Sequence, residues 1–241
     1  MNEKRWEQAG AAAGIATVVL MVLSTFLIPQ VPRLDSPTAK FVTWITAHRR
    51  GAETAMVLGM FSSGTLVWFV SHLRHVLNRA EGGAEAFAPI VFGSGLVLAA
   101  VSALGFVPVT VLALMAGQRG GLTAADAPIV HTLIVTNQVM IAPFVLLAAV
   151  FLVSLGAAMI RHELLASWLG LVALVAAALN GVSVVTTMVA GTYNQAALVV
   201  GFGGYLAWAL VVLIASVQML RLPEAAREVE RPPVFVSARA A

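Results

Sequence analysis

The sequence predicts an all-α polytopic membrane protein: a bundle of six transmembrane helices plus a short amphipathic helix on the outer surface. The first observation is composition, since 60% of the 241 residues are hydrophobic and only 10% are charged, against about 25% charged in soluble domains. The second is that five long stretches contain no Asp, Glu, Lys or Arg: residues 8–32, 54–73, 87–118, 127–160 and 164–220. A helix needs about 20 apolar residues to cross a bilayer, so the last stretch holds two spans and the others one each.

The expected spans form one transmembrane domain that covers residues 1–222. Their approximate bounds are residues 11–28, 52–73, 87–116, 128–160, 164–191 and 197–220. They are predicted as helices because lipid leaves no partner for exposed backbone groups, and because no stretch alternates with the period of two that is typical of strands. Residues 223–241 mix Arg and Glu with Pro, which predicts a disordered cytoplasmic tail.

The basic residues predict the orientation of this bundle. Six spans place both termini on one side, and that side collects nine positive residues: Lys4, Arg5, Arg74, Arg79, Arg161, Arg221, Arg227, Arg231 and Arg239. The other side has five, namely Arg33, Lys40, Arg49, Arg50 and Arg119. The positive-inside rule therefore predicts a multi-pass plasma-membrane protein with both termini in the cytoplasm, although Arg49 and Arg50 beside the second span argue the other way.

The first outer loop has a helical pattern of its own over residues 36–50. Ser36 suits a helix N-cap and Pro37 suits the first helical position. Side chains that can share one face follow at i, i+3, i+4 and i+7: Phe41, Trp44, Ile45 and His48. We expect the apolar face to turn toward lipid or the bundle and Lys40 to turn outward. Two roles stay open for this helix, an interfacial anchor or a lid over a cavity.

Polar side chains gather toward the outer ends of the predicted spans. We expect a binding site for a small uncharged or amphiphilic ligand there, formed by His131, Asn137 and Gln138 of the fourth span, Asn180 and Thr187 of the fifth, and Glu53 at the start of the second. Gln138 is expected to face the fifth span and to share a water-accessible space with Asn180 or Thr187. The competing interpretation is that these groups only form hydrogen bonds between helices.

Two prolines interrupt the third and fourth spans. Proline has no N–H to donate to the carbonyl four residues earlier, so Pro108 and Pro143 are expected to bend their helices. Such bends would separate the outer ends of the two spans.

Several classes of chemistry find no support in the sequence. The chain has no cysteine, and the paired histidines His72 and His75 lack a third metal ligand at suitable spacing. No Gly-rich phosphate loop and no Ser-His-acid set is present, so we expect no catalytic residue, no metal and no cofactor. The basic residues form no block, which argues against nucleic acid as a partner.

Three segments carry a resemblance to a known family. The segment AHRRG ends the outer loop, LRHVLNRAEGG forms the turn before the third span, and SWLGLVALVAAAL opens the fifth span. Together they resemble a broad group of small six-span membrane proteins of unknown function that are common in high-GC Gram-positive bacteria. The resemblance implies the six-helix fold and a plasma-membrane location, and it brings no catalytic or ligand-binding residue with it.

Three hypotheses for the function follow. The leading one is a protein that binds, or helps to transport, a small uncharged or amphiphilic molecule or a lipid through an outward-facing cleft. The second is a structural or accessory subunit that contacts the lipid bilayer and a second copy or a partner membrane protein through its small-residue faces. The third is a membrane enzyme that uses His131 as its base.

Overall fold

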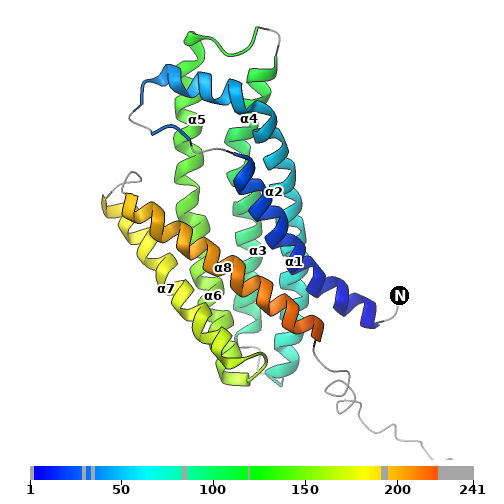
Figure 1. The fold of residues 1–241 in the computed structure, drawn as a ribbon. Coiled ribbons are helices and arrows are strands. Elements are labelled where there is room, and N and C mark those ends of the chain that lie inside the picture. The colour runs from blue at the N-terminus through cyan, green and yellow to red at the C-terminus, as the bar shows by residue number, and fades with distance from the viewer. Residues whose placement is uncertain are drawn as a thin grey trace, which may run out of the picture.

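The structure, a computed structural model, describes residues 3–28, 31–33, 36–82, 86–118, 120–190 and 195–221. Every regular element in these ranges is helical (Figure 1): α1 (Glu3–Leu27), α2 (Thr38–Ala80), α3 (Ala88–Gly105), α4 (Val107–Gly117), the 3₁₀ turn η1 (Ala124–Asp126), α5 (Ala127–Val139), α6 (Ile141–His162), α7 (Ser167–Ala190) and α8 (Gln195–Arg221). The tail expected at residues 223–241 lies outside the described residues.

Six segments of this part of the chain are long and apolar enough to cross a membrane. They are α1, α2, α3 with α4, α5 with α6, α7, and α8. The predicted all-α membrane bundle is therefore confirmed. Figure 1 shows the start of α1 and the end of α8 at the same end of the bundle as the α2–α3 and α6–α7 connections. We call this the proximal end, and the end that holds the α1–α2 and α4–α5 connections the distal end.

The predicted bounds of the second span and the outer helix are wrong. A single 43-residue helix, α2, replaces a separate helix over residues 36–50 and a span over residues 52–73. At 1.5 Å per residue it measures about 65 Å along its axis, roughly twice the thickness of a bilayer core. The charged segment between the two predicted helices stays helical because Arg49 and Arg50 favour helix and Gly51 alone does not end one.

The start of α2 packs on the distal ends of α4 and α5. Phe41, Trp44 and Ile45 are buried there, and Lys40 is exposed, so the predicted orientation of this segment is confirmed. We call this second hydrophobic core the distal cluster; its buried members are Phe41, Trp44, Ile45, Ala52, Val109, Leu112, Ala113, Val130 and Ile134. In Figure 1 the start of α2 and the α4–α5 connection lie beyond the distal ends of α7 and α8.

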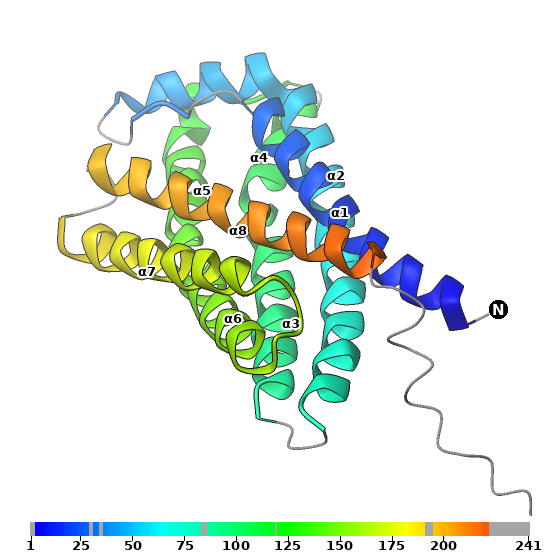
Figure 2. The same cartoon turned by 60° about the horizontal axis from the view of Figure 1, so that its bottom comes forward.

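The main core lies between all six spans and extends to the proximal end. Small residues let its helices approach closely: a β-carbon at Gly156 of α6 would lie 2.8 Å from the Gly170 carbonyl oxygen of α7. Figure 2 shows α8 running beside α7 and reaching α1, which are its two main neighbours. This dense packing contrasts with the distal half, where two of the spans are interrupted.

Candidate functional site

The third span is broken where its proline predicts. Pro108 cannot donate to the carbonyl of Leu104, and α3 ends at Gly105, one residue beyond it, while α4 begins at Val107. Phe106, between the two helices, points its ring at α2, where a β-carbon at Gly59 would collide with it. Glycine at position 59 therefore makes the space that holds the break residue in place.

The fourth span is broken in the same way. Pro143 leaves the carbonyl of Val139 without its helical donor, and Val139 is the last residue of α5. The backbone N–H of Met140 still donates to the Thr136 carbonyl at 3.1 Å, and α6 starts at Ile141. The span is therefore interrupted three residues before Pro143, at the position where the proline predicts a disturbance of the helix.

A single side chain connects the two breaks. The Nδ2 atom of Asn137 in α5 donates to the carbonyl oxygen of Gly105, the last residue of α3, at 2.8 Å. This bond satisfies a carbonyl at the end of a helix, where helical partners run out. It also fixes the amide, because only the nitrogen can donate to a carbonyl, so Oδ1 must be the other amide atom. Asn137 Oδ1 accepts no hydrogen bond from the described residues.

An open cavity of about 370 Å³ lies at the paired breaks. Its lining comes from α1 and the start of the α1–α2 connection, from both sides of the Phe106 break, and from both sides of the Met140 break: Met21, Thr25, Ile28, Val31, Val101, Ser102, Gly105, Phe106, Val109, Asn137, Met140, Ile141 and Phe144. None of these side chains is ionisable. The cavity is therefore mainly apolar and carries only three polar side chains: Thr25, Ser102 and Asn137.

Two of the three polar groups are available to a ligand. The hydroxyl of Ser102, in a side chain that is only 8% exposed, forms no hydrogen bond with the described part of the chain. Asn137 Oδ1 likewise accepts no hydrogen bond from the described residues. Thr25 is already engaged, since its hydroxyl donates to the Met21 carbonyl at 2.9 Å and lies 3.2 Å from the Tyr205 hydroxyl. A ligand that donates a hydrogen bond can therefore find an acceptor at either Ser102 or Asn137.

Aromatic side chains join the cavity to α8. The ring of Phe144 lies edge-on to Trp208, with 6.1 Å between the ring centroids, and Tyr205 stacks on Trp208 at 6.5 Å. Trp208 is fully buried, and its Nε1 atom has no partner among the described residues. Phe144 lines the cavity and packs against the buried Trp208. Protein contacts therefore hold this wall of the cavity in place.

The predicted site residues do not all meet at this cavity. Asn137 lines it, but Asn180 of α7 is fully buried and its Nδ2 donates to Ala176 at 2.8 Å and to Gly204 of α8 at 3.2 Å. Gln138 is half-buried on α5, a helix whose main neighbours are α2, α4 and α6. The structure therefore holds Gln138 and Asn180 in different helix pairs, and neither of them lines the cavity.

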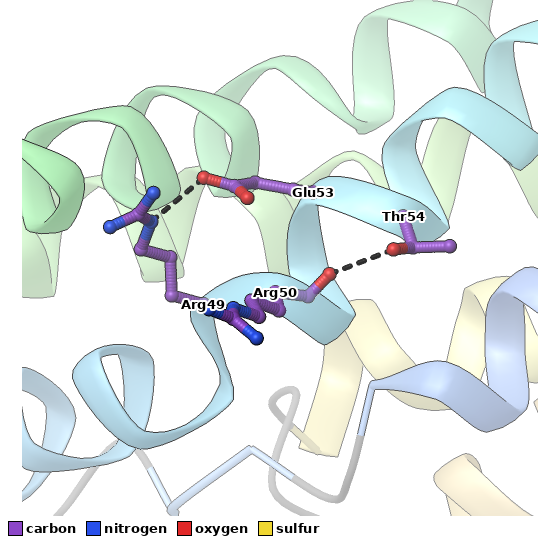
Figure 3. A network of polar contacts seen from close by, with 4 residues as sticks. All are labelled: Arg49, Arg50, Glu53 and Thr54. Atoms are coloured by element: carbon purple, nitrogen blue, oxygen red, sulfur yellow. Dashed lines mark hydrogen bonds and ion pairs between the residues drawn. The ribbon is translucent and has the colours of Figure 1, made fainter.

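The remaining predicted residues lie elsewhere or outside the description. His131 is half-buried in α5 with its ring edge-on to Phe41, at 5.6 Å between ring centroids. Glu53 accepts a bond from Arg49 Nε at 2.8 Å on its own helix (Figure 3). The side chain of Thr187 lies outside the described residues. No group of three or more His, Cys, Asp or Glu side chains in the described ranges could hold a metal ion.

Sequence reasoning missed four residues of the cavity that matter: Thr25, Ser102, Gly105 and Phe106. Thr25 and Ser102 look like ordinary membrane hydroxyls that bond to their own helix, and Thr25 does form such a bond. Gly105 and Phe106 could have been found from the sequence, since a proline in a span predicts a break two or three residues before it.

Comparisons with known proteins add no relative to this picture. No protein-family model, no curated protein and no solved structure matches the chain.

Proposed function

We propose that this membrane protein binds one uncharged, mainly apolar molecule in the cavity at the paired helix breaks. The observation that supports the proposal is the lining: apolar walls, no ionisable side chain, and two polar groups with unused hydrogen-bonding capacity, Ser102 Oγ and Asn137 Oδ1. Ligand pockets generally combine apolar walls with a few placed polar groups and measure about 300–1,000 Å³. The ligand class is an amphiphile with a hydroxyl or an amide N–H.

Charged ligands fit this cavity poorly. An ion transferred from water to an apolar site loses hydration that only a counter-charge and several hydrogen bonds can replace. The cavity offers two neutral groups for that purpose. An uncharged hydroxyl or amide needs one partner, which either Ser102 or Asn137 supplies.

Ligand occupancy tests this proposal directly. Gly105 lines the cavity and a β-carbon there meets no atom within 4 Å, so Gly105→Phe is designed to place a large side chain in the cavity from a position with open space. The control is Gly93→Phe, since Gly93 lies in the same helix, has equally open space and is not among the lining residues. We expect native mass spectrometry of protein purified in mild detergent to show a bound small molecule in the wild type and in Gly93→Phe but not in Gly105→Phe. Equal occupancy in both variants contradicts the proposal.

We further propose that the protein lies in the plasma membrane with its proximal end in the cytoplasm, because most basic residues belong to that end. The chain contains no cysteine, so single-cysteine labelling has no background. In intact cells an impermeant maleimide is expected to label Gln118→Cys at the distal end and not Arg161→Cys at the proximal end. The reverse pattern means that the orientation is inverted.

A further inference from the structure

A second polar site lies at the distal end, on the surface of α2 and outside the cavity. A hollow of about 430 Å³ is lined by Leu27 of α1 and by six consecutive residues of α2: Thr46, Ala47, His48, Arg49, Arg50 and Gly51. Two arginines and a histidine therefore border one hollow at the level where α2 enters the bundle. Arg49 and Arg50 also lie at the end of the protein that has fewer basic residues in all.

The two arginines have different environments. Arg49 Nε donates to Glu53 Oε1 at 2.8 Å, and a β-carbon at Gly117, the last residue of α4, would lie 2.8 Å from Arg49 Cζ. A cation at the C-terminal end of a helix is favoured by the helix dipole. The charge of Arg49 is therefore balanced within the protein.

Arg50 has no such balance. Its side chain is exposed and forms no ion pair with the described residues, and in Figure 3 no dashed line joins its guanidinium to the Arg49–Glu53 pair. Only its backbone carbonyl is engaged, by the Thr54 hydroxyl at 2.9 Å. The guanidinium is left with its full set of donors, which match the oxygens of a phosphate group in pairs.

His48 is oriented by its own helix. Its Nδ1 atom lies 2.8 Å from the Trp44 carbonyl oxygen, which can only accept, so Nδ1 carries the hydrogen of this bond. The indole of Trp44 lies against the imidazole at 5.6 Å between ring centroids. These two contacts fix the ring and leave Nε2 as its remaining polar atom in the lining of the hollow.

The apolar edge of the hollow continues along α1 as a lipid-facing stripe. Leu27, Leu23 and Val19 follow one another at intervals of four residues, which places them on one face of the helix, and they are 38%, 51% and 48% exposed. A cationic hollow above an exposed apolar stripe has the polarity of a phospholipid: a charged headgroup at the interface and acyl chains below it.

We propose that this hollow binds the headgroup of an anionic phospholipid, with Arg50 holding the phosphate, His48 beside it, and an acyl chain along Leu27, Leu23 and Val19. The site is independent of the cavity at the helix breaks. It commits to a lipid rather than to a free anion because the apolar stripe is continuous with the hollow.

The test counts bound lipids on the full-length protein in detergent by native mass spectrometry during titration with phosphatidylglycerol. We expect Arg50→Gln to weaken phosphatidylglycerol binding roughly tenfold, the effect of losing a charge-assisted hydrogen bond. The affinity of Arg50→Lys for phosphatidylglycerol is expected to lie between those of the wild type and Arg50→Gln, because lysine keeps the charge but loses the paired donors. The matched control is Lys40→Gln, an exposed cation of the same helix that does not line the hollow.

Further arms separate the possible sources of binding. Phosphatidylcholine is expected to bind more weakly than phosphatidylglycerol and to be insensitive to Arg50→Gln, and inorganic phosphate is not expected to displace the lipid. The proposal is overturned if Lys40→Gln weakens binding as much as Arg50→Gln, or if inorganic phosphate displaces phosphatidylglycerol, which indicates a free-anion site. Loss of phosphatidylglycerol binding in Gly105→Phe overturns the proposed location, since the lipid then occupies the cavity.

Discussion

Two asparagines in neighbouring parts of the bundle have opposite surroundings. Asn180 of α7 is fully buried against α8, and its amide nitrogen donates both to its own helix and to the Gly204 carbonyl. Asn137 of α5 also donates to a carbonyl of another helix, that of Gly105, yet it lines an open cavity. The same residue type therefore closes one helix pair and borders a space in another.

The backbone around each asparagine explains the difference. Opposite Asn180, α8 carries a glycine, and a β-carbon at Gly204 would lie 2.8 Å from Asn180 Oδ1, so only glycine lets the helices meet. Around Asn137, Pro108 and Pro143 interrupt two spans, and the open cavity lies where the two interruptions meet. Small residues remove volume between helices, and proline breaks create it.

The largest effect is expected when the closed region is forced apart. Gly204→Leu places a branched side chain against the Asn180 amide, so we expect the free energy of unfolding to fall by about 3 kcal/mol, the upper range for overpacking. Its neighbour Gly203 has open space around it, and Gly203→Leu is expected to change stability by less than about 0.5 kcal/mol. Unfolding in detergent measures both. If the two variants lose similar amounts of unfolding free energy, α7 and α8 do not pack closely at Gly204.

Truncation of each asparagine sharpens the comparison. Asn180→Ala is expected to lower the free energy of unfolding by about 1 kcal/mol, through the loss of its bonds and of packing, and to leave ligand occupancy unchanged. Asn137→Ala is expected to cost only about 0.6 kcal/mol of stability but to weaken ligand binding roughly fivefold, the worth of one hydrogen bond. If Asn180→Ala weakens binding more than Asn137→Ala does, the assignment of roles is reversed.

The smallest effect on stability is expected from the prolines. Pro143→Ala gives the Val139 carbonyl a possible N–H partner, so we expect slower hydrogen exchange over residues 139–144 and a change in the free energy of unfolding below about 0.5 kcal/mol. Pro89→Ala is the control, because Pro89 lies in the first turn of α3, where its missing N–H has no helical acceptor. Unchanged exchange in Pro143→Ala means that the break has another cause.

Much of the fold could be predicted because hydropathy and backbone chemistry act locally. Stretches without charge indicated six spans, and Pro108 and Pro143 indicated where two of them break. The start of α2 was predicted as a helix with Phe41 toward lipid or the bundle, but its continuity with the second span was not, since the charged residues Arg49, Arg50 and Glu53 lie between the two apolar patterns. The arginines permit this continuity by their helix propensity, and the start of α2 also packs against α4 and α5, which lie far away in sequence.

The site was predicted only in part, because the sequence does not show how each helix is rotated about its own axis. Depth along a span follows from counting residues, so Asn137 and Asn180 were both placed in the distal half. Which neighbour each one faces depends on how the helices are rotated, and that is set by contacts such as Phe106 against Gly59 and Asn180 against Gly204. A hydropathy pattern does not contain this information for helices that are apolar on every side.

The central claim is that the paired breaks hold a ligand, and an experimental structure of the protein purified in mild detergent tests it most directly. The account predicts non-protein density in the cavity between Phe106 and Phe144, with a polar atom of that density within hydrogen-bonding distance of Ser102 Oγ or Asn137 Oδ1. A structure in which α4 and α5 close over the cavity, with Ser102 and Asn137 bonded only to protein, contradicts it.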